Sequence, residues 1–181
     1  MENEHDKAHL LSITHEGKRA ESIAVRILAQ HLLGYWQLPY LGIEKDSCDK
    51  PYLAGYTFPV SVSHTARYAA VIIHRSQKVG IDIEQIKAKL QKVAPKFLSL
   101  REQAFAGNNL ETLCICWCAK EVLYKKYGKK NLSLKDEIFI QPFNGQPQSS
   151  INGEIIQADY REPATIRYMK FFDYILAYSY E

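Results

Sequence analysis

Three short apolar runs follow one another closely between residues 60 and 84, and they constrain the fold more than any other segment of the chain. The runs cover residues 60–63, 68–74 and 79–84, and they contain many of the β-branched residues that are enriched in strands. Short turns separate the runs, which favours antiparallel pairing of neighbours. The sequence therefore predicts an antiparallel meander in the middle of the chain.

Two longer segments have the apolar spacing of helices. Residues 18–33 repeat apolar side chains at positions i and i+4, and Gly34 follows as a stop signal. A second helix is expected over residues 110–127, where Gly128 has the same terminal position. We therefore expect a glycine to end each long helix.

The rest of the chain adds a short helix and further strands. Ser99 and Glu102 have the spacing of a capping box, which predicts a helix that ends near the following Gly-Asn-Asn sequence. Residues 138–140, 151–156 and 166–180 are again strand-like. The second part of the chain is thus expected to combine helices with a sheet.

The composition excludes some classes of partner. The chain has 181 residues, 46% of them hydrophobic and 24% charged, which is typical of a globular protein of one domain or two closely packed halves. Its net charge of +3, without dense Lys/Arg runs, argues against nucleic acid and favours an anionic small molecule or an acidic protein. No apolar stretch approaches the roughly 20 residues of a membrane span, and the first residues do not resemble a signal peptide. We expect a cytoplasmic protein that does not contact a membrane.

Four cysteines are present, three of them at alternate positions in one segment: Cys48, Cys114, Cys116 and Cys118. This spacing is awkward for paired disulfides and poor for a tetrahedral zinc site. We interpret these cysteines as small buried side chains in a reducing compartment.

A pair of acids lies within the third apolar run. Asp82 and Glu84 are separated by one residue, so a strand places both on one face while Ile81 and Ile83 point to the core. The pair could be a solvent-facing feature of an edge strand. Like charges held so close raise each other's pKa unless a cation lies between them. A hard divalent ion with oxygen ligands, most plausibly magnesium, would meet that need.

A third acid, Glu121, makes the metal interpretation stronger. It shares a helical stripe with Trp117, a residue whose large ring normally faces packing partners. A carboxylate turned toward protein is costly unless it is paired or bound to metal. The alternative is a surface pair between Glu121 and Lys125 at i and i+4, which would contribute only about 0.3 to 0.5 kcal/mol.

Basic residues upstream are candidates for phosphate contacts. His64 follows a strand run directly and precedes the acidic strand, so it could donate to a phosphate oxygen, although a turn histidine without a role is the simpler interpretation. Arg19 and Arg26 lie seven residues apart on one helical face and could grip a phosphate. Together with Lys18 and Lys50 they could equally form a solvated face.

The combination of these segments resembles the 4'-phosphopantetheinyl transferase superfamily, specifically its Sfp-type branch, the surfactin-synthetase-activating one. The matching pieces are Val62-Ser63-His64-Thr65, Val79-Gly80-Ile81-Asp82-Ile83-Glu84, Phe97-Leu98-Ser99 with Glu102, and Trp117-Cys118-Ala119-Lys120-Glu121 followed by Lys125. The similarity covers residues 18–127, with a weaker echo in the C-terminal strands. The Gly-Ile-Asp-Ile-Glu sequence alone is suggestive, and with the Trp-x-x-Lys-Glu helix downstream it is highly specific.

The resemblance implies an enzyme that transfers the phosphopantetheine arm of coenzyme A to a serine of an apo acyl or peptidyl carrier protein and releases adenosine 3',5'-bisphosphate. By analogy, the metal ligands for magnesium are Asp82, Glu84 and Glu121. By the same analogy, the coenzyme A site includes Arg19, Lys50, Ser63, His64, Asp82 and Lys125. Glu121 and Lys125 are the implied catalytic residues, and Glu121, or a water that it orients, is the best candidate to take the serine proton. The assignment agrees with the demand of phosphoryl-type transfer for charge neutralisation by a metal and basic side chains.

Two features depart from the branch. Its members usually have a further strand region before the first helix, whereas this helix begins almost at once, so we expect an abbreviated first half. The loop usually written Gly-Lys-Pro is Asp49-Lys50-Pro51 here, which places a negative charge beside an implied phosphate contact.

We therefore expect an α+β protein of two pseudo-symmetric halves, each a small antiparallel sheet packed with a long helix. Residues 1–78 would supply coenzyme A contacts, and residues 79–181 would supply the metal site and the catalytic helix. The ligands would lie in the cleft between the halves, and the chain would act as a monomer. The alternatives are a magnesium-dependent phosphodiesterase or nuclease that uses the same acids, and a non-catalytic relative that binds a carrier protein.

Overall fold

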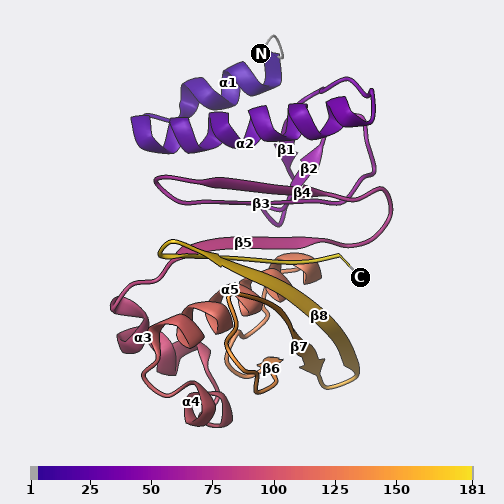
Figure 1. Cartoon of the computed structure of the whole chain (residues 1–181). Coiled ribbons are helices and arrows are strands. Elements are labelled where there is room, and N and C mark those ends of the chain that lie inside the picture. The colour runs from indigo at the N-terminus through magenta and orange to yellow at the C-terminus, as the bar shows by residue number, and fades with distance from the viewer. Residues whose placement is uncertain (1–3, 181) are drawn as a thin grey trace.

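The computed structural model describes residues 4–180, which form helices and antiparallel strands (Figure 1). The helices are α1 (Glu4–Ser12), α2 (Glu16–Tyr35), α3 (Lys89–Phe97), α4 (Leu100–Ala106) and α5 (Leu110–Tyr127). The strands are β1 (Ile43–Lys45), β2 (Pro51–Leu53), β3 (Val60–His64), β4 (Ala69–Ile73), β5 (Gly80–Gln85), β6 (Ile138–Ile140), β7 (Gln148–Gln157), β8 (Tyr160–Phe171) and β9 (Tyr174–Ser179). The expected α+β class is confirmed. Within residues 4–180, no helix is both long enough and apolar enough to span a membrane.

The first part of the chain is built on α2, which packs against the antiparallel β3–β4 hairpin (Figure 1). Val25, Ala29 and Leu33 recur every four residues along α2 and are buried, so the helix is confirmed, but Ile27 of the expected apolar spacing is exposed and the helix runs past Gly34 to Tyr35. The helix begins at Glu16 because the His15 side chain accepts a hydrogen bond from the Lys18 backbone N–H. The short helix α1 and the β1–β2 pair were not expected as separate elements.

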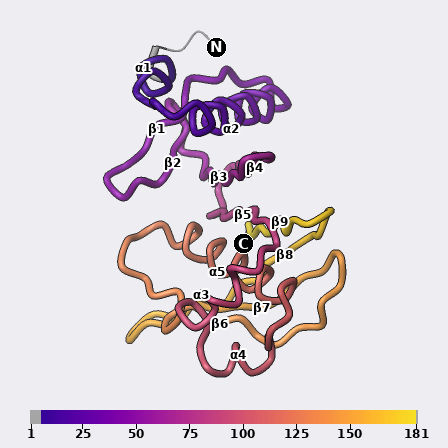
Figure 2. Tube along the Cα trace, turned by 90° about the vertical axis from the view of Figure 1, so that its left-hand side faces the viewer, coloured from indigo at the N-terminus to yellow at the C-terminus, as the bar shows by residue number. Residues whose placement is uncertain are grey.

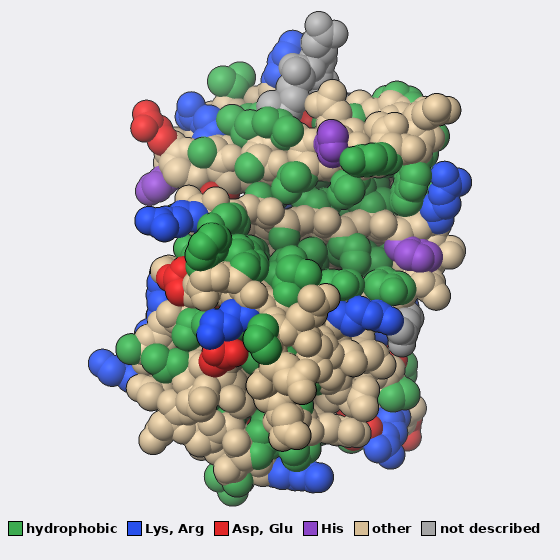
Figure 3. Space-filling view, viewed as in Figure 1, with side chains coloured by type: hydrophobic (Ala, Val, Ile, Leu, Met, Phe, Trp, Pro, Cys, Tyr) green, Lys and Arg blue, Asp and Glu red, His purple; other side chains and the backbone are tan. Residues whose placement is uncertain are grey.

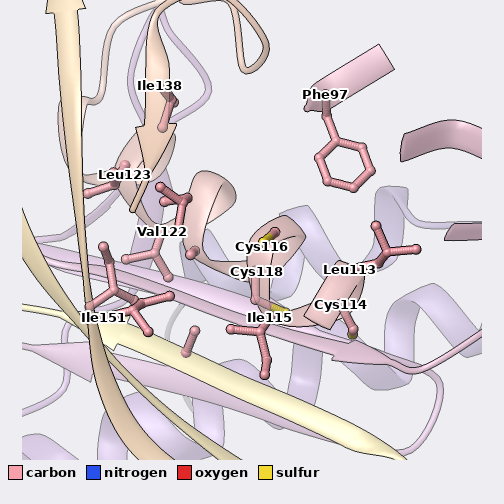
Figure 4. Packing of buried hydrophobic residues seen from close by; sticks show 14 of the residues in the cluster. Phe97, Leu113, Cys114, Ile115, Cys116, Cys118, Val122, Leu123, Ile138 and Ile151 are labelled. Carbon is pink, nitrogen blue, oxygen red and sulfur yellow. The ribbon is translucent and has the colours of Figure 1, made fainter. Parts of the chain in front are cut away.

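The second part of the chain is a five-stranded sheet in the order β5-β9-β8-β7-β6, with α5 against it. Both the start and the end of α5 agree with the prediction, and its C-cap Gly128 is left-handed. Figure 4 shows α5 side chains packed toward neighbouring elements. The labelled residues of this buried cluster are Phe97, Leu113, Cys114, Ile115, Cys116, Cys118, Val122, Leu123, Ile138 and Ile151. The interpretation of the α5 cysteines as buried free thiols is confirmed, whereas Cys48 is half-buried.

The capping box at the start of α4 is confirmed and has a further use. The Ser99 hydroxyl accepts from the Glu102 N–H, and the Glu102 carboxylate accepts from the Ser99 N–H. The same carboxylate pairs with Lys120 of α5 at 2.8 Å, and both side chains are buried. Lys120 also donates to the Leu134 carbonyl at 2.7 Å. The lysine of the Trp-x-x-Lys-Glu sequence therefore ties α5 to α4, and it faces away from the acids described below.

The predicted meander is wrong at its third strand. β3 and β4 pair antiparallel, but β5 pairs with β9 near the other end of the chain. β5 does not pair with the β3–β4 hairpin through its backbone. The edge of β5 that does not face β9 instead forms hydrogen bonds with the hydroxyls of Ser61 and Ser63 on β3. They accept from the N–H groups of Ile81 at 3.1 Å and Ile83 at 3.2 Å. Side chains of β3 thus replace the backbone partners that an ordinary strand would provide.

The two parts of the chain meet along β5, which lies between them in Figures 1 and 2. Ile81 and Ile83 point into a small buried cluster with Ala70 and Tyr174, so the expectation that they face a core is confirmed. Hydrophobic side chains gather across the middle of the face shown in Figure 3, where the two parts meet. The pseudo-symmetry of the halves and their boundary at residues 78–79 remain predictions.

Candidate active site

The three acids singled out in the sequence lie on β5 and α5, which pack against each other. Burial, followed by the charges of Asp82 and Glu84, raises the pKa of Glu121 to about 7, and Lys125 opposes the shift. Burial and Asp82 likewise raise the pKa of Glu84, although a hydrogen bond with Trp117 lowers it. The acids are therefore close enough for each to be sensitive to the charge of its neighbours.

Asp82 is the most enclosed of the three acids, with 4% of its surface exposed. Its Oδ1 accepts from Lys125 Nζ at 2.7 Å and from the Ser63 hydroxyl at 2.8 Å. Its Oδ2 is buried and has no hydrogen-bond partner within residues 4–180. A buried carboxylate oxygen without a partner is costly, and a bound cation would remove that cost.

The Lys125 ammonium group donates hydrogen bonds to three oxygens where the two parts of the chain meet. Besides Asp82, it donates to the Ile81 carbonyl at 3.0 Å and to the Val62 carbonyl at 3.3 Å. These oxygens belong to β5 and β3, so the lysine of α5 contacts both parts of the chain. It places a positive charge beside the acids.

The three acids fit a hard divalent cation by their chemistry. All their donor atoms are carboxylate oxygens, which Mg²⁺ prefers, and the free Oδ2 of Asp82 provides a ligand atom that nothing else uses. As arranged here, no group of three or more His, Cys, Asp or Glu side chains among residues 4–180 is gathered tightly enough to hold a metal. Lys125 on Asp82 is the contact that a cation would have to displace or accommodate.

A cavity of about 810 Å³ lies next to the acids. Its described lining contains seven lysine and arginine side chains and only two carboxylates, and it draws on α1, α2, β1–β3 and the C-terminal end of α5. Lys125 belongs to this lining and also contacts Asp82, so it connects the cavity with the acids. The volume suits a small-molecule ligand, and the charge balance favours an anionic one.

His64 lies in this lining but already has a partner. Its Nδ1 is 2.9 Å from the Glu21 carboxylate, which also accepts from Lys18 at 2.8 Å. Burial lowers the pKa of His64, and Glu21 opposes that shift. No sequence pattern distinguishes Glu21, because a single acid on a helix resembles any other, although its side chain is only 12% exposed.

Lys50 reaches the cavity by crossing the end of α5. Its Nζ lies 2.4 Å from the position that a Cβ on Gly128 would occupy, so the absent side chain makes room for the lysine. Burial lowers the pKa of Lys50. The neighbouring Asp49 is exposed and faces Lys130 at 3.2 Å, so a cation of the cavity lining opposes the negative charge noted in the sequence.

The two arginines predicted to form a phosphate grip have different positions. Arg19 donates through Nε and Nη2 to the Ile13 carbonyl at 3.0 and 2.7 Å, and it is not part of the cavity lining. Arg26 is in the lining, but it is buried and pairs with Asp6 at 2.7 Å. The structure therefore does not bring these two guanidinium groups together at one open site.

Ser63, implied as a coenzyme A contact, also has a defined position. Its hydroxyl donates to Asp82 and accepts from the Ile83 N–H. Its single proton is thus committed to the acid, and the residue orients Asp82.

The family model described as the 4'-phosphopantetheinyl transferase superfamily matches residues 78–178. The matched segment is more than half of the chain and includes Asp82, Glu84, Glu121 and Lys125. None of the curated proteins matches the chain.

Proposed function

Because the chain belongs to the 4'-phosphopantetheinyl transferase superfamily, we propose that it is an Sfp-type enzyme that transfers 4'-phosphopantetheine from coenzyme A to a serine of an apo carrier protein. The observation that carries the proposal is the position of Lys125, which contacts the acid cluster and lines the basic cavity at once. Metal and anion would therefore bind side by side, as transfer from a pyrophosphate requires.

Asp82, Glu84 and Glu121 are the proposed magnesium ligands. The unpartnered Asp82 oxygen supports this assignment, and so does the pKa of both glutamates, which burial and the Asp82 charge raise, because a bound cation would offset both effects. When bound, magnesium would neutralise charge on the pyrophosphate oxygens.

The cavity is the proposed coenzyme A site. Lys50, His64 and Lys125 line it and would donate to phosphate oxygens. Ser63 would act indirectly by fixing Asp82. For Arg19 to take part, its guanidinium would have to leave the Ile13 carbonyl.

Glu121 is the proposed proton acceptor. The serine oxygen of the carrier forms a bond to the phosphorus next to the pantetheine arm, and the bond from that phosphorus to the bridging oxygen breaks. The serine proton passes to the Glu121 carboxylate, and adenosine 3',5'-bisphosphate leaves. A magnesium ion bound beside Glu121 would keep its carboxylate ionised and able to accept the proton, and the ammonium of Lys125 would offset charge on the leaving phosphate.

The proposed partner is an acidic carrier protein, and the net charge of +3 would favour the encounter. We further propose that the protein acts as a monomer, because one chain carries both the acids and the cavity. We also propose that it is located in the cytoplasm.

The test is to incubate the protein with apo acyl and peptidyl carrier proteins, coenzyme A and magnesium, and to measure the carrier mass. We expect a gain of one phosphopantetheine group that disappears when magnesium is replaced by EDTA. No mass gain with any carrier would refute the transferase, and coenzyme A cleavage without a carrier would indicate a phosphodiesterase instead.

A further inference from the structure

Helix α1 is attached to the rest of the molecule through a carboxylate. Among its side chains from Asp6 to Ser12, Asp6 is buried with 1% exposed, whereas Leu11 is 77% exposed. A surface helix is ordinarily held by an apolar stripe. The docking of α1 therefore depends strongly on the contacts of one acidic side chain.

Those contacts come from three other segments. Arg26 of α2 donates to Asp6 Oδ1 at 2.7 Å, and the Tyr40 hydroxyl donates to Oδ2 at 2.7 Å. The Ile43 N–H of β1 lies 3.4 Å from Oδ1, and Arg26 also donates to the Ile43 carbonyl at 3.3 Å. Burial and the Asp6 charge raise the pKa of Tyr40. Asp6 thus joins α1 to α2, to the segment after α2 and to β1.

The same helix and the turn after it form a wall of the basic cavity. His9 and Ile13 both line it, and so does Arg26. Burial lowers the pKa of His9, and the charges of Arg26 and Lys45 lower it further. In Figure 1, α1 lies along α2 on the side away from β3 and β4, and α2 is the element that it packs against.

We propose that Asp6 is a positioning residue for coenzyme A, because it clips α1 against α2 and so keeps His9 and Ile13 in the cavity wall. The inference rests on the proposed function, since the ligand is the coenzyme A assigned there. Asp6 also neutralises Arg26, so the arginine is held as part of the wall and does not act as a free phosphate donor.

The test compares Asp6→Asn with Tyr40→Phe and the unaltered protein. Hydrogen exchange reports the docking of α1, calorimetric titration gives the affinity for coenzyme A, and steady-state kinetics give KM and kcat. For Asp6→Asn we expect faster exchange in α1, unchanged protection in α5, and about tenfold weaker binding of coenzyme A. KM for coenzyme A should rise while kcat stays the same, since α1 contributes His9 to the cavity wall whereas the acids lie on β5 and α5.

Tyr40→Phe removes one hydrogen bond without leaving a buried charge unpaired, so it should give a smaller change in the same direction. It also carries the test if Asp6→Asn does not fold. Unchanged hydrogen exchange in α1 would contradict the proposal that Asp6 holds α1 against α2. Faster exchange with unchanged or tighter coenzyme A binding would contradict the role of α1 in the site. If the unaltered protein does not bind coenzyme A, the proposed function itself fails, which is a distinct result.

Discussion

At the scale of single residues, Glu121 is the side chain whose charge depends most on what the site contains. Burial and two neighbouring acids hold its pKa near 7, above the ordinary value of 4.5. An acid with a raised pKa in the folded state costs stability once it ionises. Stability of the metal-free protein should therefore fall as pH rises from about 4.5 to 7 and then level off.

Glu121→Gln should remove most of this loss. In EDTA at pH 8, we expect the variant to be more stable than the unaltered protein by about 1–3 kcal/mol, because no charge is buried beside Asp82. At pH 4 the difference should be small. Urea unfolding at both pH values measures it, and a difference that does not depend on pH would contradict the proposed charge crowding.

Lys125→Met tests the contact between the lysine and Asp82. Loss of the ammonium leaves a buried carboxylate without its ion pair, so the metal-free protein should lose about 1–3 kcal/mol. Added Mg²⁺ should then raise Tm more than it does in the unaltered protein, because the cation supplies the missing charge.

Lys129→Met is the matched control for this experiment, since Lys129 also lines the cavity but its ammonium lies against the Tyr127 ring. Its response to Mg²⁺ should equal that of the unaltered protein. An equal Tm response in Lys125→Met as well would show that Lys125 does not occupy the metal position.

At the scale of elements, the end of α5 serves both the helix and the cavity. Gly128 has φ of 71° and lies directly under Lys50. Gly128→Ala should strain the left-handed cap and push Lys50 aside, with a loss of about 1–2 kcal/mol of stability and weaker coenzyme A binding. Urea unfolding and calorimetric titration measure the two effects.

Gly107 at the end of α4 offers a matched control, because its φ is also positive and no atom lies within 4 Å of a Cβ placed there. Gly107→Ala should show the strain alone and leave coenzyme A binding unchanged. If both variants bind coenzyme A equally, Lys50 is not a ligand contact.

Helices were easier to predict than strand partners, for a physical reason. α2, α4 and α5 have local signals, namely apolar spacing, a capping box and a terminal glycine. The pairing of β5 with β9 joins residues 89 to 99 positions apart, and no local pattern encodes it. No local pattern predicts that the hydroxyls of Ser61 and Ser63 accept hydrogen bonds from β5.

At the scale of the whole molecule, the closeness of the three acids and Lys125 could be anticipated because their residue types and spacings are distinctive, and their catalytic and metal-binding roles stay predictions. The residues that pair with His64 and Arg26 could not be predicted, because their residue types are common on helices. Glu21 beside His64 and Asp6 beside Arg26 are single acids on helices, and only the tertiary structure shows what they contact. The resemblance implied a coenzyme A contact for Arg19, whereas its guanidinium donates to the Ile13 carbonyl.

The central claim is that the acids of β5 and α5 form one catalytic site with the basic cavity. The most direct measurement is the mass of an apo carrier protein after incubation with coenzyme A, magnesium and either the unaltered protein or Asp82→Ala. We expect the phosphopantetheine mass gain with the unaltered protein and none with Asp82→Ala, although its circular dichroism spectrum should stay the same. An equal mass gain from a folded Asp82→Ala variant would contradict the account.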